Sequence, residues 1–393
     1  MKAPEMNNSD IEASVVIPCL NEADTLEVCI RKADRALTEA GIRHEIIVAD
    51  NGSTDGSREI AAASGARVVP VPKRGYGAAL MGGIEAAAGS CAIMADGDDS
   101  YDFAECPRFV AELRKGAEFV QGCRLPAGGG TVMPGAMPWS HRWIGTPLFT
   151  FLARRWFGAR IHDINCGYRA FTLDAYRRLG LRCTGMEFAT EMIVKACIHD
   201  VKITEVPICL HPDGRKAHPP HLRTMRDGWR HLRLLLMCSP HWLFMVPGTI
   251  LILAGLLGYA LALGHVQVGR AVLDVHTLLV SGAILLCGYQ AIAFSLIMKT
   301  FALREGWQKS NPLLERLYRW FDLEKGLLAG LACAVAGLGM IAWTFAVWAQ
   351  AGFGELDYRN TMRAAIPGAM LLTLGAQTCF LSFFSSTIGM WRK

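Results

Sequence analysis

Four carboxylates lie within seven residues of the segment MADGDDSYDF. They are Asp96, Asp98, Asp99 and Asp102, and they directly follow the apolar run CAIMA, which is typical of a buried strand. A carboxylate at the start of a helix can cap it, and we assign that role to Asp102. Capping does not require the other three together, and their mutual repulsion predicts a nearby cation. Mg²⁺ and Mn²⁺ suit such a site because hard divalent ions bind carboxylate oxygens.

Short apolar runs alternate with helical patterns through the first 125 residues. This alternation predicts an α/β fold in which a mainly parallel, Rossmann-like sheet is covered by helices on both faces. In such sheets, ligands bind at the carboxyl ends of the strands. The predicted strands are 14–18, 44–49, 67–71, 91–95 and 117–122, and the predicted helices are 24–40, 58–64, 78–88 and 105–115.

Acidic residues follow three of these predicted strands. The first strand continues into PCLNE, which ends at Glu22, and the second strand ends at Asp50. The fourth strand is followed by Asp96 and Asp98. Because the carboxyl ends of parallel strands meet at one edge of a sheet, we expect these acidic groups to converge there. The alternative is that they only cap helices.

The glycine-rich segment RGYGAALMGG distinguishes between possible cofactors. It contains G-x-G, but Leu80 stands where a dinucleotide-binding fingerprint has its third glycine. The chain also has no G-x-x-x-x-G-K-[ST] motif, so it is not a P-loop NTPase. A divalent ion shared between carboxylates and substrate phosphates fits better. Asp-x-Asp after a strand is typical of metal-dependent nucleotide-sugar transferases.

An ordered series of motifs carries a family resemblance. VVIPCLNE, IIVADNGSTDGS, KRGYGAALMGGIEAA and MADGDDSYDF together resemble the family 2 glycosyltransferases of the GT-A fold. HDINCGYRAF, GMEFATEMIVKA, ITEVPI and RDGWRHLRLLL are similar to the branch that makes polyisoprenyl-phosphate sugars, such as dolichyl-phosphate mannose or glucose synthases. The resemblance covers residues 13 to 237. It implies a nucleotide-diphosphate sugar as donor, Mg²⁺ or Mn²⁺ as cofactor, and a polyisoprenyl phosphate lipid as acceptor.

The resemblance also implies roles for individual residues. Asp96 and Asp98 would be the D-x-D pair that holds the metal and supports catalysis, and Ser100 is a third candidate ligand. The resemblance places four residues in the nucleoside pocket: Pro18, Asn21, Glu22 and Asp50. Only Asp50 remains of the acidic pair that the family often has after the second strand, because Asn51 follows it.

Basic residues in loops are candidates for gripping phosphate, since a guanidinium offers several directed donors. We expect Arg124 and Arg215 to hold the acceptor phosphate and to take part in catalysis. The other candidate substrate-binding residues are Lys73, Arg142, Arg169, Glu187 and Lys216. Arg169 is alternatively structural, paired with Asp163 or Glu191. Glu187 either serves as a base, as Asp163 and Glu191 also could, or orients Arg169.

Beyond about residue 240 the chain changes character. Four apolar blocks follow, at about 242–264, 276–298, 326–350 and 366–390, and each is long enough to cross a bilayer as a helix. Six Lys and Arg residues lie between Lys299 and Lys325, whereas the other two connections carry few. This bias predicts a multi-pass protein of the cell membrane, with both termini and the catalytic domain in the cytoplasm. The thirteen cysteines are scattered singly, as expected for reduced cytosolic residues.

The segment between the two regions has two interleaved stripes at helical spacing. One stripe is basic, from Arg223 to Arg233, and the other is apolar, including Met225 and Trp229. We expect this helix to lie at the membrane surface, although packing on the sheet is the alternative. The predicted domains are therefore 1–221 (catalytic), 222–240 (interfacial helix) and 241–393 (membrane). A net charge of +5 gives no indication of nucleic-acid binding, and self-association stays open.

Three functions compete at this point. We favour an inverting, metal-dependent hexosyltransferase that acts on polyisoprenyl phosphate. The same fold could instead act on a hydroxyl of a glycerolipid, a sphingolipid or a glycan. Chain extension is disfavoured because no Q-x-x-R-W motif is present. A non-catalytic membrane protein that only senses nucleotide sugar is the third alternative, but the predicted spans carry almost no ionisable residues that could form a transport path.

Overall fold

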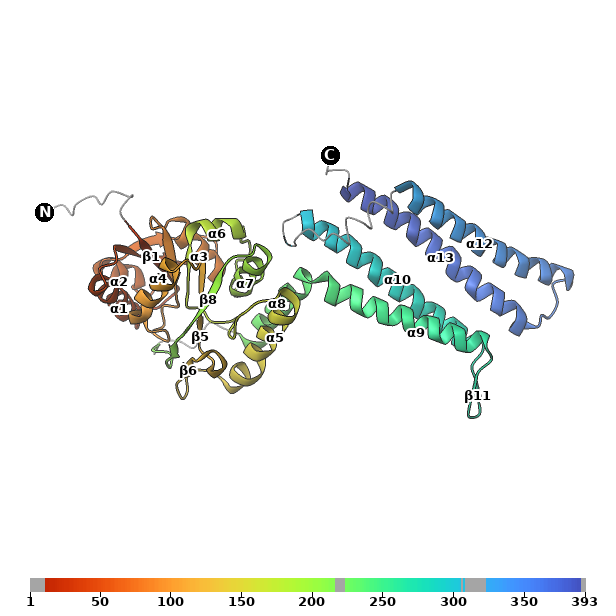
Figure 1. Cartoon of the computed structure of the whole chain (residues 1–393), viewed down its shortest axis with the longest axis horizontal. Helices are drawn as coiled ribbons and strands as arrows, with labels where there is room; N and C mark the ends of the chain where they lie inside the picture. Colours follow the sequence, from red (N-terminus) through yellow and green to blue (C-terminus); the bar gives the residue numbers. More distant parts are fainter. Residues whose placement is uncertain (1–10, 216–222, 305–306, 308–322, 390–393) are drawn as a thin grey trace. The chain divides into compact units, whose positions relative to one another are not determined.

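The structure is a computed structural model that describes residues 11–215, 223–304, 307 and 323–389. Lys216 and the central residues of the predicted basic loop therefore lie outside the described residues. The chain divides into two compact units, Met1–Leu235 and Leu236–Lys393 (Figure 1).

A seven-stranded sheet forms the centre of the first unit, with the strand order β3-β2-β1-β4-β7-β5-β8. β7 runs antiparallel to β4 and β5, and the other pairs are parallel, so the expected mainly parallel α/β fold is confirmed. The strands are β1 Ala13–Cys19, β2 His44–Asp50, β3 Arg67–Pro70, β4 Cys91–Met94, β5 Phe119–Cys123, β7 Arg169–Thr172 and β8 Ile203–Pro207. A short separate pair joins β6 Thr131–Val132 to β9 Cys209–Leu210.

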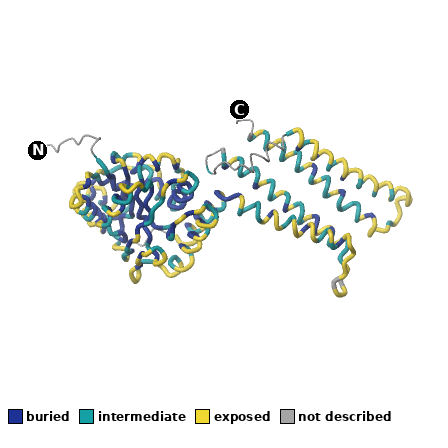
Figure 2. The backbone as a smooth tube through the Cα atoms, in the orientation of Figure 1, coloured by how far each residue is buried: buried dark blue, intermediate teal, exposed yellow. Residues whose placement is uncertain are grey.

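Amphipathic helices connect these strands. In the first helix, the buried residues Leu26, Ile30, Ala33 and Leu37 recur every three or four positions and face the core. Figure 2 shows that buried residues run through the centre of this unit. The helices are α1 Leu26–Glu39, α2 Ser57–Ala63, α3 Tyr76–Glu85, α4 Cys106–Arg114, α5 Thr146–Phe157, α6 Leu173–Leu179 and α7 Phe188–Ile198.

The register of the parallel strands fixes where their loops lie. Cys19 at the end of β1 pairs with Asp50 at the end of β2, so these two ends are level. Val16 pairs with Met94, which brings the end of β4 to the same edge. Asp50, at the end of β2, and the loops that carry Glu22 and Asp98 therefore lie at the same edge, as the alternation of strands and helices predicts.

The described part of the second unit consists mainly of four long apolar helices. By length and composition, all four could cross a membrane. Glycines allow close packing within each neighbouring pair: a Cβ on Gly288 would lie 2.8 Å from the carbonyl of Gly248, and one on Gly375 would lie 2.5 Å from that of Gly330. The helices are α9 Val246–Leu263, which a π-helical turn at His241–Met245 precedes, α10 Val275–Arg304, α12 Leu323–Gln350 and α13 Tyr358–Gly389.

Helix α8, Thr224–Cys238, begins in the first unit and anchors there through His231. The His231 side chain is buried, and its Nδ1 atom lies 2.6 Å from the Thr190 hydroxyl on α7. Burial lowers the pKa of His231 to about 4, although the carboxylates of Glu187 and Asp227 oppose this shift. The folded protein therefore holds this histidine neutral at physiological pH.

This buried histidine predicts an acid-sensitive stability. Its ordinary pKa is 6.5, so the unfolded chain takes up a proton below that pH while the folded chain stays neutral until about pH 4. The contribution of His231 to the free energy of unfolding is intact above pH 6.5. The free energy of unfolding therefore falls by about 2 kcal/mol between pH 7 and pH 5. In thermal unfolding of the purified protein, His231→Gln should show a smaller drop of the midpoint over this range than the wild type. An equal drop would show that His231 does not cause the acid sensitivity.

Candidate active site

The D-x-D pair lies at the carboxyl end of β4, in a largely enclosed site. The Tyr76 hydroxyl on α3 donates a hydrogen bond to Asp96 Oδ1 at 2.8 Å. Desolvation, followed by the charge of Asp98, raises the pKa of Asp96 to about 6. Gly167 lies against the same carboxylate, since a Cβ there would be 3.0 Å from Asp96 Oδ2. Asp96 is thus held among neighbours that supply only partial compensation for its charge.

Asp98 is buried and fully engaged. The Ser100 hydroxyl donates to Asp98 Oδ1 at 2.6 Å, and Arg215 Nη2 donates to Asp98 Oδ2 at 2.6 Å. The same guanidinium places Nε 2.9 Å from Glu22 Oε2. Arg215, which the sequence analysis assigned to the acceptor phosphate, therefore bridges two of the acidic groups that converge at this edge.

The other two carboxylates of the motif have separate partners. Asp99 pairs with Lys32 on α1 at 2.8 Å. Asp102 accepts a hydrogen bond from the backbone N–H of Ala104, so its predicted role as a helix cap is confirmed. Lys32 is thus the counterion of Asp99 in this structure, and a divalent ion at Asp96 and Asp98 stays a prediction.

The predicted nucleoside-pocket residues form a network between the first two strand ends. Asp50 is 1% exposed, and it accepts hydrogen bonds from the backbone of Gly52 and Ser53 and from Arg58 Nε. Burial raises the pKa of Asp50, but these donors outweigh it and the net direction is down. Asn21, in a left-handed conformation with φ 62°, accepts from the Thr54 N–H. Nucleoside binding by Pro18, Asn21, Glu22 and Asp50 stays a prediction.

Asn51 is a positioning residue that was not among the site residues predicted from the sequence. Its Nδ2 atom donates to the carbonyls of Val71 and Lys73, and its Oδ1 atom accepts from the N–H of Gly75. These bonds hold the glycine-rich segment that carries the exposed Lys73, at a point where Gly75 has φ 135°. The signal in the sequence was the amide itself, since asparagine can donate and accept at once.

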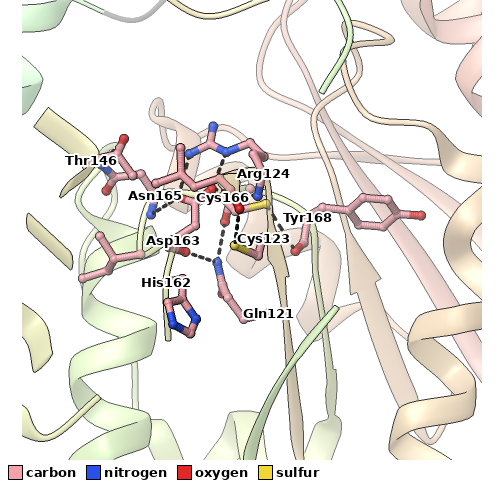
Figure 3. A network of polar contacts seen from close by, with 12 residues as sticks. Gln121, Cys123, Arg124, Thr146, His162, Asp163, Asn165, Cys166 and Tyr168 are labelled. Atoms are coloured by element: carbon pink, nitrogen blue, oxygen red, sulfur yellow. Dashed lines mark hydrogen bonds and ion pairs between the residues drawn. The ribbon is translucent and has the colours of Figure 1, made fainter. Parts of the chain in front are cut away.

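Arg124 lies in a buried ion pair, and its guanidinium is not an open phosphate clamp (Figure 3). Its Nε and Nη2 atoms donate to the two oxygens of Asp163 at 2.7 and 2.9 Å. Asp163 is fully buried, and the side chain of Arg124 is 11% exposed. Two of the donor groups of Arg124 are thus engaged by a carboxylate, and acceptor binding by Arg124 stays a prediction.

Arg169 is also structural, but in neither of the two predicted pairings. It is fully buried and donates to the backbone carbonyls of Ile164, Cys166 and Ala189. A substrate-binding role for Arg169 is corrected, since burial keeps its guanidinium from a substrate. Its bonds fix the segment after Asp163.

Glu187 and Glu191 have different surroundings at the start of α7. Glu191 is buried, pairs with Lys195 at 2.9 Å and accepts from the backbone N–H groups of Arg182 and Cys183. Glu187 keeps one buried oxygen, Oε2, without a hydrogen-bond partner among the described residues. Of the three carboxylates considered as bases, only Glu187 therefore has an uncommitted atom.

An exposed apolar surface lies around Arg142, in a segment that was predicted from the sequence to be a loop. Arg142 sits on a π-helical turn, His141–Gly145, that leads into α5, and its guanidinium lies 5.4 Å from the Trp143 ring. Five large apolar side chains of this region are exposed: Trp139, Trp143, Ile144, Leu148 and Phe151. On α8, Met225 and Trp229 are also exposed, whereas Leu234 and Leu235 are buried. Met225 and Trp229, two residues of the apolar stripe that was expected at a membrane, therefore do not pack on the domain.

The donor atoms at this edge fit a hard divalent ion. Asp96 and Asp98 offer two carboxylates, and the adjacent Ser100 offers a hydroxyl. Within the described ranges there is no group of three or more His, Cys, Asp and Glu side chains suited to a metal. Mg²⁺ and Mn²⁺ commonly take one or two carboxylates and complete their coordination with water and substrate phosphates. The pKa of Asp96 is raised by desolvation and then by the charge of Asp98, and a cation would offset both effects.

This α/β domain, with an acidic site at the carboxyl edge and an apolar helical region after it, defines a GT-A glycosyltransferase. "Glycosyl transferase family 2" matches residues 14–180, and "Glycosyltransferase family 2 C-terminal transmembrane region" matches residues 296–389. The low-salt glycan biosynthesis hexosyltransferase Agl6 of Haloferax volcanii is 36% identical over 380 residues, covering 96% of this chain and 89% of that protein. The chain belongs to glycosyltransferase family 2, as the motifs predicted, and it is a membrane protein.

Other relatives share shorter stretches. The dolichyl-phosphate hexose transferase of Haloferax volcanii is 30% identical over 198 residues, covering 50% of this chain and 82% of that protein. An undecaprenyl-phosphate 4-deoxy-4-formamido-L-arabinose transferase of Klebsiella pneumoniae is 28% identical, covering 64% and 75%. Among solved structures, glucosyl-3-phosphoglycerate synthase from Mycobacterium tuberculosis is 23% identical with a TM-score of 0.45, covering 60% and 84%.

The Arg124–Asp163 pair predicts a large, coupled effect on stability. Removing one partner leaves the other charge buried, so Arg124→Gln and Asp163→Asn should each destabilise the first unit by about 3 kcal/mol. The double variant should cost less than the sum of the two. Denaturant unfolding measures these values, with Arg142→Gln as a control expected to change stability by about 0.5 kcal/mol or less. Additive effects of the two single variants would contradict the pairing.

Proposed function

We propose that this enzyme transfers a hexose, with inversion, from a nucleoside-diphosphate sugar to a polyisoprenyl phosphate. The observation that carries the proposal is the D-x-D pair at the carboxyl edge of the sheet, in a chain that continues into four apolar helices. The names of two relatives, a dolichyl-phosphate hexose transferase and an undecaprenyl-phosphate sugar transferase, support this acceptor class. The hexosyltransferase Agl6 supports a hexose.

The proposed donor site combines metal ligands with the network at the first two strand ends. Asp96 and Asp98 would hold Mg²⁺ or Mn²⁺, with Ser100 supporting Asp98. The bound ion supplies positive charge that stabilises the diphosphate as the glycosidic bond breaks. Asn21 and Asp50 would line the nucleoside pocket, on loops that Ser53 and Arg58 hold rigid. Lys73, presented by the segment that Asn51 fixes, would add a cation near the donor.

The acceptor chemistry accounts for the absence of an assigned base. A phosphate monoester has its second pKa near 6, so at neutral pH it is already an anionic nucleophile. It needs orientation and charge neutralisation, which Arg142 would provide together with Arg215, whose guanidinium would be shared between the acceptor phosphate and the donor diphosphate. Asp163 and Glu191 are committed to ion pairs, and this argues against either as a base. The rival reaction, transfer to a lipid hydroxyl, would need a base, and Glu187 is the candidate because its Oε2 atom is uncommitted.

The membrane side of the proposal concerns α8 and the four apolar helices. The exposed Met225 and Trp229 of α8, with the neighbouring arginines, suit a helix at the bilayer surface. We propose that the catalytic domain and both termini lie in the cytoplasm, following the bias of basic residues between the helices. A cytoplasmic site next to the bilayer would meet both a soluble sugar donor and a lipid phosphate.

Metal dependence provides the first test of the proposed reaction. Asp98→Ala removes a hard ligand, so hexose transfer from a panel of nucleotide sugars should fall by a factor of at least about 10³. Chelation of the wild type should abolish transfer, and Mg²⁺ or Mn²⁺ should restore it. Lys32→Gln, next to the same motif but paired with Asp99, is the control and should retain most of the activity. Full activity of Asp98→Ala in excess chelator would refute the metal site.

The chemical nature of the product separates the two acceptor classes. With polyisoprenyl phosphate, mass spectrometry should find a sugar phosphodiester. Glu187→Gln should retain measurable turnover, since no base is required. Glu85→Gln, an exposed change on α3, serves as its control. A sugar attached to a lipid hydroxyl, or complete loss of turnover in Glu187→Gln with lipid and donor still bound, would favour the rival reaction.

A further inference from the structure

We propose that Arg215 is a built-in counter-cation of the metal site, and that the divalent ion and Arg215 compete for Asp98. The guanidinium holds Asp98 and Glu22 when no metal is bound, and it moves to the substrate phosphates when the metal takes over the carboxylate. The inference rests on the proposed function, because it assigns an order of events to the same metal site.

Arg215 contacts the same carboxylate, Asp98, that would hold the divalent ion. Its Nη2 atom is 2.6 Å from Asp98 Oδ2, the oxygen that Ser100 leaves unused, since Ser100 donates to Oδ1. Its Nε atom is 2.9 Å from Glu22 Oε2. The metal would draw on the same carboxylate charge, so each cation weakens the binding of the other.

The geometry of this ion pair is incomplete. The Arg215 side chain is only 9% exposed, yet its Nη1 and Nε atoms are buried without a hydrogen-bond partner among the described residues. Nε is close to Glu22 but lacks hydrogen-bond geometry. Buried donors without partners lose stabilisation, so this pair is easier to break than a fully bonded one. An unpartnered Nη1 beside the proposed metal site is also a ready donor for a phosphate oxygen.

The backbone around Arg215 is held in place, so the exchange needs only a side-chain movement. The Gly214 N–H donates to the carbonyl of Asp98 at 2.9 Å, and the His211 N–H donates to that of Ser100 at 2.9 Å. A Cβ on Gly214 would lie 3.3 Å from the Asp98 carbonyl, so this close approach suits glycine. The segment thus runs along the D-x-D loop and keeps the guanidinium within reach of both partners.

Lys32 provides a matched comparison within the same acidic motif. It pairs with Asp99 at 2.8 Å, and both side chains are more exposed than those of the Arg215–Asp98 pair, at 39% and 26%. Removing Lys32 changes the local charge as much as removing Arg215, but it frees no oxygen of Asp98. The two variants therefore separate direct competition from the general field of a nearby charge.

The experiment is a titration of the purified full-length protein with Mn²⁺, with free Mn²⁺ measured by electron paramagnetic resonance. It is made without nucleotide, then with UDP and with GDP, on the wild type, Arg215→Gln, Arg215→Lys and Lys32→Gln. Without nucleotide, Arg215→Gln should bind Mn²⁺ about tenfold more tightly than the wild type, and Lys32→Gln no more than about threefold. Arg215→Lys should fall between them, because it keeps the charge without the fork.

Each outcome supports or overturns the inference. With either nucleotide, the advantage of Arg215→Gln should shrink, because the freed guanidinium then binds the diphosphate. Unchanged or weaker Mn²⁺ binding by Arg215→Gln, or an equal gain in Lys32→Gln, overturns the competition while the metal site stands. No Mn²⁺ binding by the wild type and Arg215→Gln under all conditions overturns the metal site as well. If Arg215→Gln does not fold, Arg215→Lys decides by the same criterion.

Discussion

Neutralisation of the carboxylates after β4 is the constraint on which the rest of the site depends. Four acidic side chains within seven residues repel one another, and each has a different partner in the fold. Lys32 balances Asp99, Arg215 balances Asp98 and a backbone N–H satisfies Asp102. Among the described residues, the Tyr76 hydroxyl is the hydrogen-bond donor to Asp96, and desolvation together with the charge of Asp98 raises the pKa of Asp96 to about 6. Asp96 is thus the carboxylate of this motif that would gain most from an added cation.

Two kinds of arginine lie around this acidic edge, and they differ in how completely their guanidinium groups are hydrogen-bonded. Arg124 and Arg169 are fixed by good geometry, the first to Asp163 and the second to backbone carbonyls, so they hold the segment that lies against Asp96. Arg215 is buried but poorly bonded, which suits an exchangeable contact. We propose that a rigid frame with one exchangeable cation keeps this crowded acidic site folded and would let it accept a metal.

The sequence predicted the strands up to residue 123 and the four apolar helices, because apolar periodicity and long apolar runs are local signals. It did not predict β7, which inserts antiparallel between β4 and β5, because strand order is a property of the whole sheet. The family resemblance pointed to the D-x-D motif. The partners of Arg124 and Arg169 could not be found from the chain, because Asp163 and the carbonyl of Ala189 become neighbours only in the fold.

We propose that Asp98 holds a divalent ion together with the substrate diphosphate. Electron–nuclear double resonance on Mn²⁺ bound to the full-length protein, in the presence of UDP or GDP, measures whether phosphorus nuclei lie in its coordination shell. The account predicts a ³¹P coupling for protein-bound Mn²⁺ in the wild type and loss of that species in Asp98→Asn. Protein-bound Mn²⁺ without ³¹P coupling, or a species unchanged by Asp98→Asn, would contradict it.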